Sequence, residues 1–392
     1  MKIAVIGSGV SGLSAAWFLK NEHDVTLFEK QNRFGGHANT STLGDINVDT
    51  GFIVFNYKTY YHLQRLFANL GVKVKKSKMS FGVSNAEIEY SSVSPFSNLN
   101  FLKGKYLKML FEIIKFNRVA KKGEVSDEIT LHEYLNSYNF SEYFRSNYIY
   151  AMAGSIWSCN IQEAKEYPAK SFIDFFKHHG LLQTINHPQW YCVDGGSKEY
   201  VKKIIDTLNT KKANVTKILP TENGVKVFYE NEEEEFDKVI IATHADEAFQ
   251  LTGEKSLSHF RYSENLAVLH KDASFMPKNK NTWSSWNYVS SSSTELCLTY
   301  WMNNLQNIDK SFPLFVTLNP SREIDTKDTF FKTIYYHPIF DFKSKIAIEE
   351  AKKIQGRDGI YYIGSYFGYG FHEDGIESAY KVCKQLITKM PW

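Results

Sequence analysis

The 392-residue sequence predicts an α/β fold, and three observations support that prediction. A short apolar run at the N-terminus passes through a glycine turn into a helical pattern. Comparable strand, glycine and helix segments return at 190–250 and 340–392. Between these segments lie a mostly helical, aromatic-rich stretch at 98–185 and alternating strand-like runs at 262–335. We therefore expect one domain assembled from separated segments, with a second, α+β domain inserted into it.

The N-terminal segment has the pattern of a dinucleotide site. Residues 3–6 are an apolar strand, and a helical pattern begins at Leu13. Gly7, Gly9 and Gly12 lie between them at G-x-G-x-x-G spacing. In that spacing the first glycine makes a tight turn, the second admits a diphosphate to the backbone, and the third packs helix on strand. The next strand ends at Glu29, which is placed to accept hydrogen bonds from a ribose.

A second glycine turn follows closely, in the segment KQNRFGGHANT. Arg33, Gly35 and Gly36 offer a basic side chain and bare backbone to the same diphosphate. The alternative is an ordinary loop in an NAD enzyme. The E-x3-R-x-GG arrangement resembles the flavin-containing amine oxidase superfamily, which includes monoamine oxidases, protoporphyrinogen oxidase and phytoene desaturases. That resemblance implies a Rossmann-type FAD-binding domain.

Two distant segments resemble the same superfamily. Residues 194–218 carry a glycine pair that opens a helix, followed by Val215, whose backbone would touch the adenine. Near the C-terminus a strand ends at Gly364, and a helix is expected to begin near Gly375 and Ile376. The N–H groups of that helix would face the flavin ring. The superfamily has Gly-Asp after this strand, whereas this chain has Gly364–Ser365, so a charge is missing there.

The resemblance implies non-covalent FAD held by residues of all these motifs. The flavin-linked cysteine of a monoamine oxidase is replaced here by Tyr366 and Phe367, and Cys383 lies too far along the helix. The expected cofactor contacts are Gly7, Gly9, Val10, Ser11, Gly12, Glu29, Lys30, Arg33, Gly35, Gly36, His37, Val215, Gly364, Ser365, Asp374, Gly375 and Ile376.

Longer phrases resemble one branch of the superfamily more closely. They include FGGHANT (34–40), DTGFIVFN (49–56), WYCVDGGSKEYV (190–201) and GYGFHEDG (368–375). This branch is the bacterial "predicted NAD/FAD-binding protein" family, an amine-oxidase-like group found beside, or fused in front of, cyclopropane-fatty-acid synthases. The resemblance implies an acyl-lipid substrate and a functional link to such a methyltransferase.

Bulk composition sets limits on the function. The chain is 43% hydrophobic and 15% aromatic, which supports sizeable cores, and its net charge of +3 gives no reason to expect a nucleic-acid partner. Four cysteines lack C-x-x-C or metal spacing, so we expect reduced thiols and no metal. The nucleotide strand starts at Lys2 and no long apolar run follows, so we expect a cytoplasmic protein.

We expect two discontinuous domains. Residues 1–57, 190–250 and 340–392 form the FAD-binding domain in this prediction, and residues 58–189 and 251–339 form the substrate domain. The acidic run at 232–235 is interpreted as a solvated hairpin turn.

Three residues are candidates for the catalytic groups. His372 and Glu373 precede the C-terminal helix, where either is an acid/base or substrate contact, or else Glu373 only favours the helix dipole. Asp374 is expected to cap that helix. Amine-oxidase relatives often use a lysine near the flavin, and Lys271 is the candidate by order along the chain, with a surface lysine as the alternative. His37 either faces the flavin or bonds backbone.

Aromatic side chains predict the class of substrate. Trp157, Trp283, Trp286 and Tyr300 fall in the predicted substrate domain, where they line an apolar pocket, form a cage for an amine, or simply pack the core. Because no acidic cluster accompanies them to hold a cation, we expect a hydrophobic small molecule or acyl lipid.

Residues 100–123 give a second indication of lipid. The segment has seven Lys or Arg against one Glu, and Leu102, Tyr106, Met109, Leu110, Ile113 and either Phe116 or Asn117 trace one helical stripe. Such a helix either lies at a membrane interface, here the inner face, or covers the lobe with its lysines in solvent.

The sequence thus predicts an FAD-dependent oxidoreductase that forms or reduces a C=C bond in a hydrophobic, fatty-acyl substrate. The alternatives are an amine oxidase that releases peroxide, a flavin-assisted double-bond isomerase, and a non-enzymatic flavoprotein subunit of a lipid methyltransferase.

Overall fold

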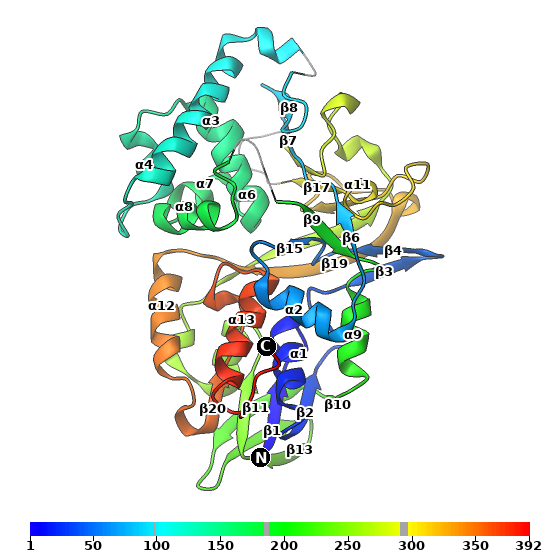
Figure 1. Cartoon of the computed structure of the whole chain (residues 1–392), viewed down its shortest axis with the longest axis vertical. Helices are drawn as coiled ribbons and strands as arrows, with labels where there is room; N and C mark the ends of the chain where they lie inside the picture. The colour runs from blue at the N-terminus through cyan, green and yellow to red at the C-terminus, as the bar shows by residue number, and fades with distance from the viewer. Residues whose placement is uncertain (97–98, 184–187, 291–296) are drawn as a thin grey trace.

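The computed structural model describes residues 1–96, 99–183, 188–290 and 297–392. Two large sheets organise the chain: one lies in the lower half, the other extends upward from the middle, and a helical lobe lies beside this second sheet (Figure 1). The predicted α/β class is confirmed. Among the described helices, none has both the length and the apolar character needed to cross a bilayer.

The first sheet is parallel throughout, and its strands come from separated parts of the sequence. In spatial order they are β10 (Asn209–Lys212), β2 (Asp24–Glu29), β1 (Lys2–Ile6), β14 (Lys238–Ile241) and β20 (Ile360–Tyr362). Because the strands are parallel, their carboxyl ends share one edge. The sheet therefore contains all three sequence segments predicted for the FAD-binding domain, while the domain boundaries stay a prediction.

Strand β1 is buried on both faces, as its apolar run predicts. Ile3 and Val5 pack into a core with helices on one side, whereas Ala4 and Ile6 pack into a separate core on the other. The first face carries α1 (Val10–Leu19), α2 (Tyr61–Leu70), α9 (Lys198–Ile205) and α13 (His372–Cys383). The second carries β11 (Val215–Pro220), β12 (Val225–Tyr229), β13 (Glu232–Phe236), α10 (Ala245–Thr252) and α12 (Phe342–Lys353).

The acidic run at 232–235 is not a turn. It forms most of β13, which pairs antiparallel with β12. The turn lies just before it, where Glu230 has a positive φ of 50°. The four glutamates are not fully buried, and Phe236 is the strand's buried residue, so a solvated strand edge produced the charge run that suggested a loop.

The second sheet is larger and mostly antiparallel. Its strands in spatial order are β19 (Thr329–Pro338), β15 (Tyr262–His270), β18 (Phe315–Leu318), β17 (Leu298–Trp301), β16 (Trp286–Val289), β7 (Phe81–Ser84) and β8 (Glu89–Ser91). The long pair β15–β19 crosses the middle of the molecule above the parallel sheet (Figure 1). It therefore forms the boundary between the two halves.

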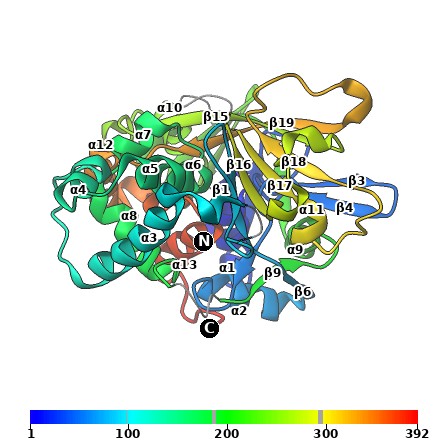
Figure 2. The same cartoon turned by 90° about the horizontal axis from the view of Figure 1, so that it is seen from above.

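The helical lobe beside this sheet fulfils the prediction for 98–185. It contains α3 (Gly104–Lys122), α4 (Leu131–Ser137), α5 (Glu142–Phe144), α6 (Ala151–Trp157), α7 (Ile161–Glu166) and α8 (Ala169–His178). A π-helical turn, Arg145–Tyr150, joins α5 to α6. Figure 2 shows the lobe and the second sheet side by side when the molecule is seen from above.

Short elements complete the chain. The small strands are β3 (Thr40–Leu43), β4 (Ile46–Asp49), β5 (Phe55–Asn56), β6 (Val74–Ser77) and β9 (Trp190–Val193), and α11 is Met302–Leu305. Asp49 ties several of them together. Its buried carboxylate accepts hydrogen bonds from Thr40 Oγ1 at 2.6 Å, from Ser197 N at 2.8 Å and Oγ at 2.7 Å, and from Gln306 Nε2 at 2.9 Å. Burial nevertheless raises the pKa of Asp49 to about 6.

Candidate functional site

The glycine turn after β1 leaves an open surface for a ligand. Gly7 has φ of +100°, which favours glycine, and a Cβ on Gly12 would lie 1.8 Å from the carbonyl oxygen of Gly7. A Cβ on Gly9 would meet no protein atom within 4 Å. Gly7 and Gly12 are therefore required by the fold itself, whereas nothing in the described chain requires a glycine at position 9.

The second glycine turn lies against the first. Gly35 N donates to Ser8 O at 3.0 Å, and a Cβ on Gly36 would lie 3.0 Å from Gly9 Cα. Arg33, half-buried, donates from Nη1 to Gly36 O at 2.7 Å. The two turns thus bring bare backbone and a guanidinium to one place, which suits an anionic diphosphate.

The carboxylate at the end of β2 is held in position at the same edge. Glu29 Oε2 accepts from Ser8 N at 3.0 Å and Ser8 Oγ at 2.5 Å, and Oε1 accepts from Gln31 N at 2.8 Å. Ala213 N donates to Glu29 O at 3.0 Å, which puts β11 and its first residue, Val215, beside this corner. Lys30 instead turns outward to Glu247 at 2.5 Å.

The C-terminal motif converges on the same edge. A Cβ on Gly375 would lie 2.7 Å from Ser11 Oγ and 2.9 Å from Val10 Cγ1, so the first turns of α1 and α13 are in contact. Gly364 N donates to Ser378 Oγ at 2.9 Å, and Ile376 is fully buried. Ser365 O accepts from Gly368 N and Gly370 N, both at 3.1 Å, which closes the loop before α13.

Helix α13 begins at His372, three residues before the predicted start. Asp374 is not the N-cap residue. Its Oδ2 accepts from Phe371 N at 2.8 Å, so it caps the helix from inside the first turn. The early start follows because this acidic residue satisfies the first free N–H group.

Glu373 and His372 each have partners that the sequence did not reveal. Glu373 accepts from His62 N at 2.6 Å and Leu63 N at 3.0 Å, and so caps the start of α2. His372 stacks on Phe52 with ring centroids 3.8 Å apart, and its Nε2 lies 3.1 Å from Tyr200 Oη. Both remain predictions as catalytic groups, and both already have structural roles.

Burial favours the uncharged forms of these groups, and their pKa values shift accordingly. Desolvation lowers the pKa of His372 to about 3 and raises the pKa of Glu373 to about 7. It also raises the pKa of Asp374 to about 7. The environment in front of α13 therefore disfavours charge of either sign.

A histidine cluster lies near the glycine turns, and only His37 was predicted. The His37 ring is 4.8 Å from Tyr335, 5.5 Å from His337 and 6.2 Å from His244. His37 Nε2 is buried and has no hydrogen-bond partner among the described residues. Burial is the first cause of a lowered pKa for His37, His244 and His337, the last to about 4. The cluster is therefore neutral at pH 7.

Lys271 does not join this site. It follows β15, whose first residue Tyr262 stacks on His244 at 4.5 Å, and it lies at the opposite end of that strand. Nine residues of strand correspond to roughly 30 Å. Lys271 is largely exposed and pairs with Asp328 at 3.6 Å. Its catalytic role stays a prediction that this position does not support.

The four aromatic residues predicted for the substrate pocket separate into three places. Trp286 and Tyr300 are cross-strand partners 5.5 Å apart and pack with Ile53 and Val54. Trp283 packs edge-on against Trp301 and bonds Pro277 O at 2.8 Å. Trp157 packs in the helical lobe against Tyr167 at 4.5 Å.

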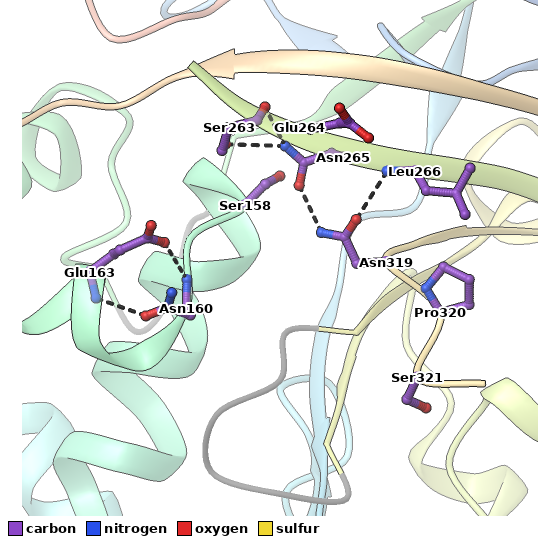
Figure 3. A pocket seen from close by; sticks show the side chains of 10 residues that line it. All are labelled: Ser158, Asn160, Glu163, Ser263, Glu264, Asn265, Leu266, Asn319, Pro320 and Ser321. Carbon is purple, nitrogen blue, oxygen red and sulfur yellow. Dashed lines mark hydrogen bonds between the residues drawn. The ribbon is translucent and has the colours of Figure 1, made fainter. Parts of the chain in front are cut away.

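Two adjoining cavities lie between the helical lobe and β15–β19, and they share Glu163 and Ser263. The polar cavity, about 450 Å³, is lined by serines and asparagines that include Asn160, Asn265 and Asn319. Asn319 Nδ2 donates to Asn265 Oδ1 at 2.8 Å, and Figure 3 shows this pair of side chains in the wall. Several polar groups of the cavity wall thus form hydrogen bonds with one another.

The aromatic cavity, about 210 Å³, includes Trp157, Tyr167, Pro338 and Phe340 in its wall. It adjoins the C-terminal motif, because a Cβ on Gly370 would lie 3.3 Å from Phe340 and 3.4 Å from Pro338. Of the four predicted pocket aromatics, only Trp157 lines it. The cavity therefore borders the loop that leads into α13.

Comparison with known proteins identifies the family. A model of flavin-containing amine oxidoreductases matches residues 10–269. The chain belongs to this family. The predicted membership of the amine oxidase superfamily and the predicted FAD cofactor are confirmed, whereas the link to cyclopropane-fatty-acid synthases stays a prediction.

Individual relatives of the flavin amine oxidoreductase match only short parts of the chain. A 4,4'-diapophytoene desaturase (4,4'-diaponeurosporene-forming) of Staphylococcus aureus (strain Newman) is 48% identical over 52 residues, 13% of this chain and 10% of that protein. The first curated relatives are matched over 24% and 10% of their own length.

Two solved structures share the fold at 14% identity. A CLA-producing fatty acid isomerase from P. acnes has a TM-score of 0.73, with 98% of each chain covered. Wild-type putrescine oxidase bound to putrescine has a TM-score of 0.73, with 99% of this chain and 100% of that chain covered. At this identity the likeness supports the fold alone.

The residues present fit FAD. The open space over Gly9, the adjacent guanidinium of Arg33 and the contact between the N-termini of α1 and α13 provide backbone N–H groups and positive charge for a diphosphate. The unpartnered Nε2 of buried His37 is a further polar atom available to a ligand. The cysteine of the C-terminal motif, Cys383, lies at the far end of α13, about 16 Å from the start of that helix. This position agrees with the prediction that the flavin is not attached to a cysteine.

Proposed function

We propose that this flavin amine oxidoreductase acts on the uncharged, hydrophobic part of an acyl-type substrate, where it forms or removes a C=C bond. FAD, when bound, supplies a two-electron acceptor or donor of hydride. The protein's share is to bind the chain, exclude water and hold the reacting carbons in place. The apolar wall of the aromatic cavity, which borders the loop before α13, is the observation that supports this proposal most strongly.

Burial also keeps the four histidines of this region uncharged. His37, His244, His337 and His372 all have lowered pKa values, so they are uncharged at pH 7. Three carboxyl groups already accept hydrogen bonds from the protein: Asp49 from four donors, Glu373 from two and Asp374 from Phe371 N. An ammonium group would have to compete with these donors.

The adjoining cavities suit an amphipathic molecule. The aromatic cavity has the apolar wall that an acyl chain needs, and the polar cavity that shares Ser263 with it can accept a neutral, hydrogen-bonding head group. In the aromatic cavity Arg261 is paired with Asp341 at 2.6 Å, so these two charges compensate each other. The names of two similar proteins, a diapophytoene desaturase and a fatty acid isomerase, agree with this substrate class.

The first competing function is an amine oxidase, which the similarity to putrescine oxidase favours. Exposed Glu163 and Glu166 lie at the cavity walls and would be its cation partners. The second is a double-bond isomerase, which uses the same substrate without net oxidation. These three functions differ in which substrate, if any, changes the redox state of the flavin.

Anaerobic flavin absorbance separates them. The purified holoenzyme is mixed with fatty-acyl esters, in oxidised and in chemically reduced form, and separately with putrescine and cyclohexylamine. We expect an acyl substrate to change the flavin redox state and the amines to leave it unchanged. Bleaching by amines alone would refute the proposal, and product without net flavin change would identify the isomerase.

A matched pair of variants tests the cavity. Ile339→Trp narrows the aromatic cavity, and Ile346→Trp makes the same change at a side chain 59% exposed on α12. We expect Ile339→Trp to slow acyl turnover about tenfold or more with unchanged flavin content, and Ile346→Trp to have no effect. Equal rates in both variants would place the substrate elsewhere.

A further inference from the structure

Exposed apolar side chains concentrate in one short segment. Of the fifteen large hydrophobic residues that are exposed in the described chain, six lie between positions 93 and 114. These are Val93, Phe96, Leu102, Leu107, Phe111 and Ile114. Phe111 is 72% exposed and Leu102 is 69% exposed. Isolated exposed hydrophobics are ordinary, but a contiguous set on one element marks an interaction surface.

Helix α3 has two apolar faces, and only one packs on the protein. Tyr106, Met109 and Phe116, members of the predicted stripe, are fully buried in the helical lobe. Leu107, Phe111 and Ile114 follow the i, i+4, i+7 spacing of a second face and point to solvent. Most of the predicted stripe therefore covers the lobe, which was one of its two alternatives, whereas its first member Leu102 and the second face are exposed.

The outer face is strongly basic. Helix α3 and the residue before it carry Lys103, Lys105, Lys108, Lys115, Arg118, Lys121 and Lys122. The single acid, Glu112, is buried and accepts from Ser141 N at 2.8 Å. Among the described residues no ion pair involves this helix; Lys115 donates to Tyr138 O at 2.6 Å. These cations are thus not paired with carboxylates in the part of the chain that the structure describes.

We propose that the outer face of α3 is a docking surface for an anionic lipid bilayer. Apolar side chains flanked by lysines suit the boundary between acyl chains and anionic head groups, because the chains take the former and the head groups pair with the latter. A second copy of this chain would bring the same cations together. A nucleic acid would pair with the cations but leave Leu107, Phe111 and Ile114 in water.

The position of the helix agrees with this role. In Figure 1, α3 lies in the upper lobe, away from the parallel sheet at the bottom. Its nineteen residues give a length of about 28 Å, enough to lie flat on a surface. The lobe also contributes Trp157 to the aromatic cavity. The proposal does not depend on the substrate class, since a surface contact is measured without turnover.

Vesicle flotation of the FAD-loaded, full-length protein tests the proposal. Vesicles of phosphatidylcholine with phosphatidylglycerol are compared with phosphatidylcholine alone, at low and high salt. We expect flotation with the anionic vesicles, weakened by salt, and little with the neutral ones. Absence of flotation with anionic vesicles overturns the proposal, as does binding to duplex DNA without flotation.

Two variants separate the apolar and charged contributions. Leu107→Ser/Phe111→Ser/Ile114→Ser removes the exposed apolar set, and Ile346→Ser is its control on α12. We expect the triple variant to bind at least about tenfold more weakly, and Lys108→Glu/Arg118→Glu to lose about fivefold per cation. Because all these side chains are exposed, flavin content and Tm should stay at the wild-type values. Unchanged flotation of the triple variant overturns the proposal.

Discussion

The substitution Gly9→Ala should weaken FAD binding without changing the stability of the fold. The residue has φ −62° and ψ 176°, which alanine adopts without strain, and its Cβ would meet no protein atom within 4 Å. The unfolding free energy of the protein without FAD should therefore change by less than about 0.5 kcal/mol.

The same methyl group would project where the diphosphate approaches the helix N-terminus. Losing one hydrogen bond to a charged group costs about 1.5–3 kcal/mol, which corresponds to roughly 10- to 150-fold weaker FAD binding. Gly12→Ala provides the contrast. Its Cβ would lie 1.8 Å from a backbone oxygen, so it should destabilise the protein even without FAD, by about 1–3 kcal/mol or more.

The assay is thermal unfolding of both variants and of Gly104→Ala, at increasing FAD concentration. Gly104 lies at the start of α3, and its Cβ would also have no neighbour within 4 Å. For Gly9→Ala we expect the wild-type Tm without FAD and a smaller increase in Tm when FAD is added. For Gly104→Ala we expect the same Tm and the same FAD-dependent increase as in the wild type. Wild-type FAD affinity in Gly9→Ala would refute the placement of the diphosphate over this turn.

Three further changes test single contacts. The pKa of Glu373 is raised from 4.5 to about 7, so the folded state binds more protons than the unfolded state between these values, and stability falls as the pH rises through that window. Glu373→Gln should make the unfolding free energy depend less on pH in this window, by on the order of 3 kcal/mol. An unchanged slope of Tm against pH would contradict this prediction. Asp49→Ala leaves the donors of Thr40, Ser197 and Gln306 unpaired and should cost about 3–5 kcal/mol by denaturant unfolding, against less than about 0.5 for exposed Thr42→Ala. Lys271→Ala should leave flavin reduction unchanged, and a large loss of rate would restore the lysine as a catalytic candidate.

The nucleotide-binding core could be predicted from the sequence because its requirements are local. A tight turn, a close helix and a ligand-facing backbone each need a glycine at a fixed offset from a strand, so Gly7, Gly9 and Gly12 identify the site without any tertiary information. The same holds for the glycine pair at 35–36, which the fold places against Gly9.

The rest of the site is assembled from residues with no common pattern in the sequence. His244 follows β14 and His337 lies near the end of β19, and only the crossing of the two sheets brings them to His37. Glu373 looks like an ordinary helix-start acid until α2 is packed against it. Helix α3 has apolar residues on two faces, so periodicity alone could not say which face the lobe covers.

The central claim is that the protein uses FAD to change a C=C bond in a hydrophobic acyl substrate. Anaerobic single-turnover incubation of the holoenzyme with fatty-acyl esters, followed by mass spectrometry of the acyl products, tests it directly. We expect the product to differ from the substrate by two hydrogen atoms, in step with the flavin absorbance. Unaltered acyl chains combined with flavin bleaching by putrescine would contradict the claim.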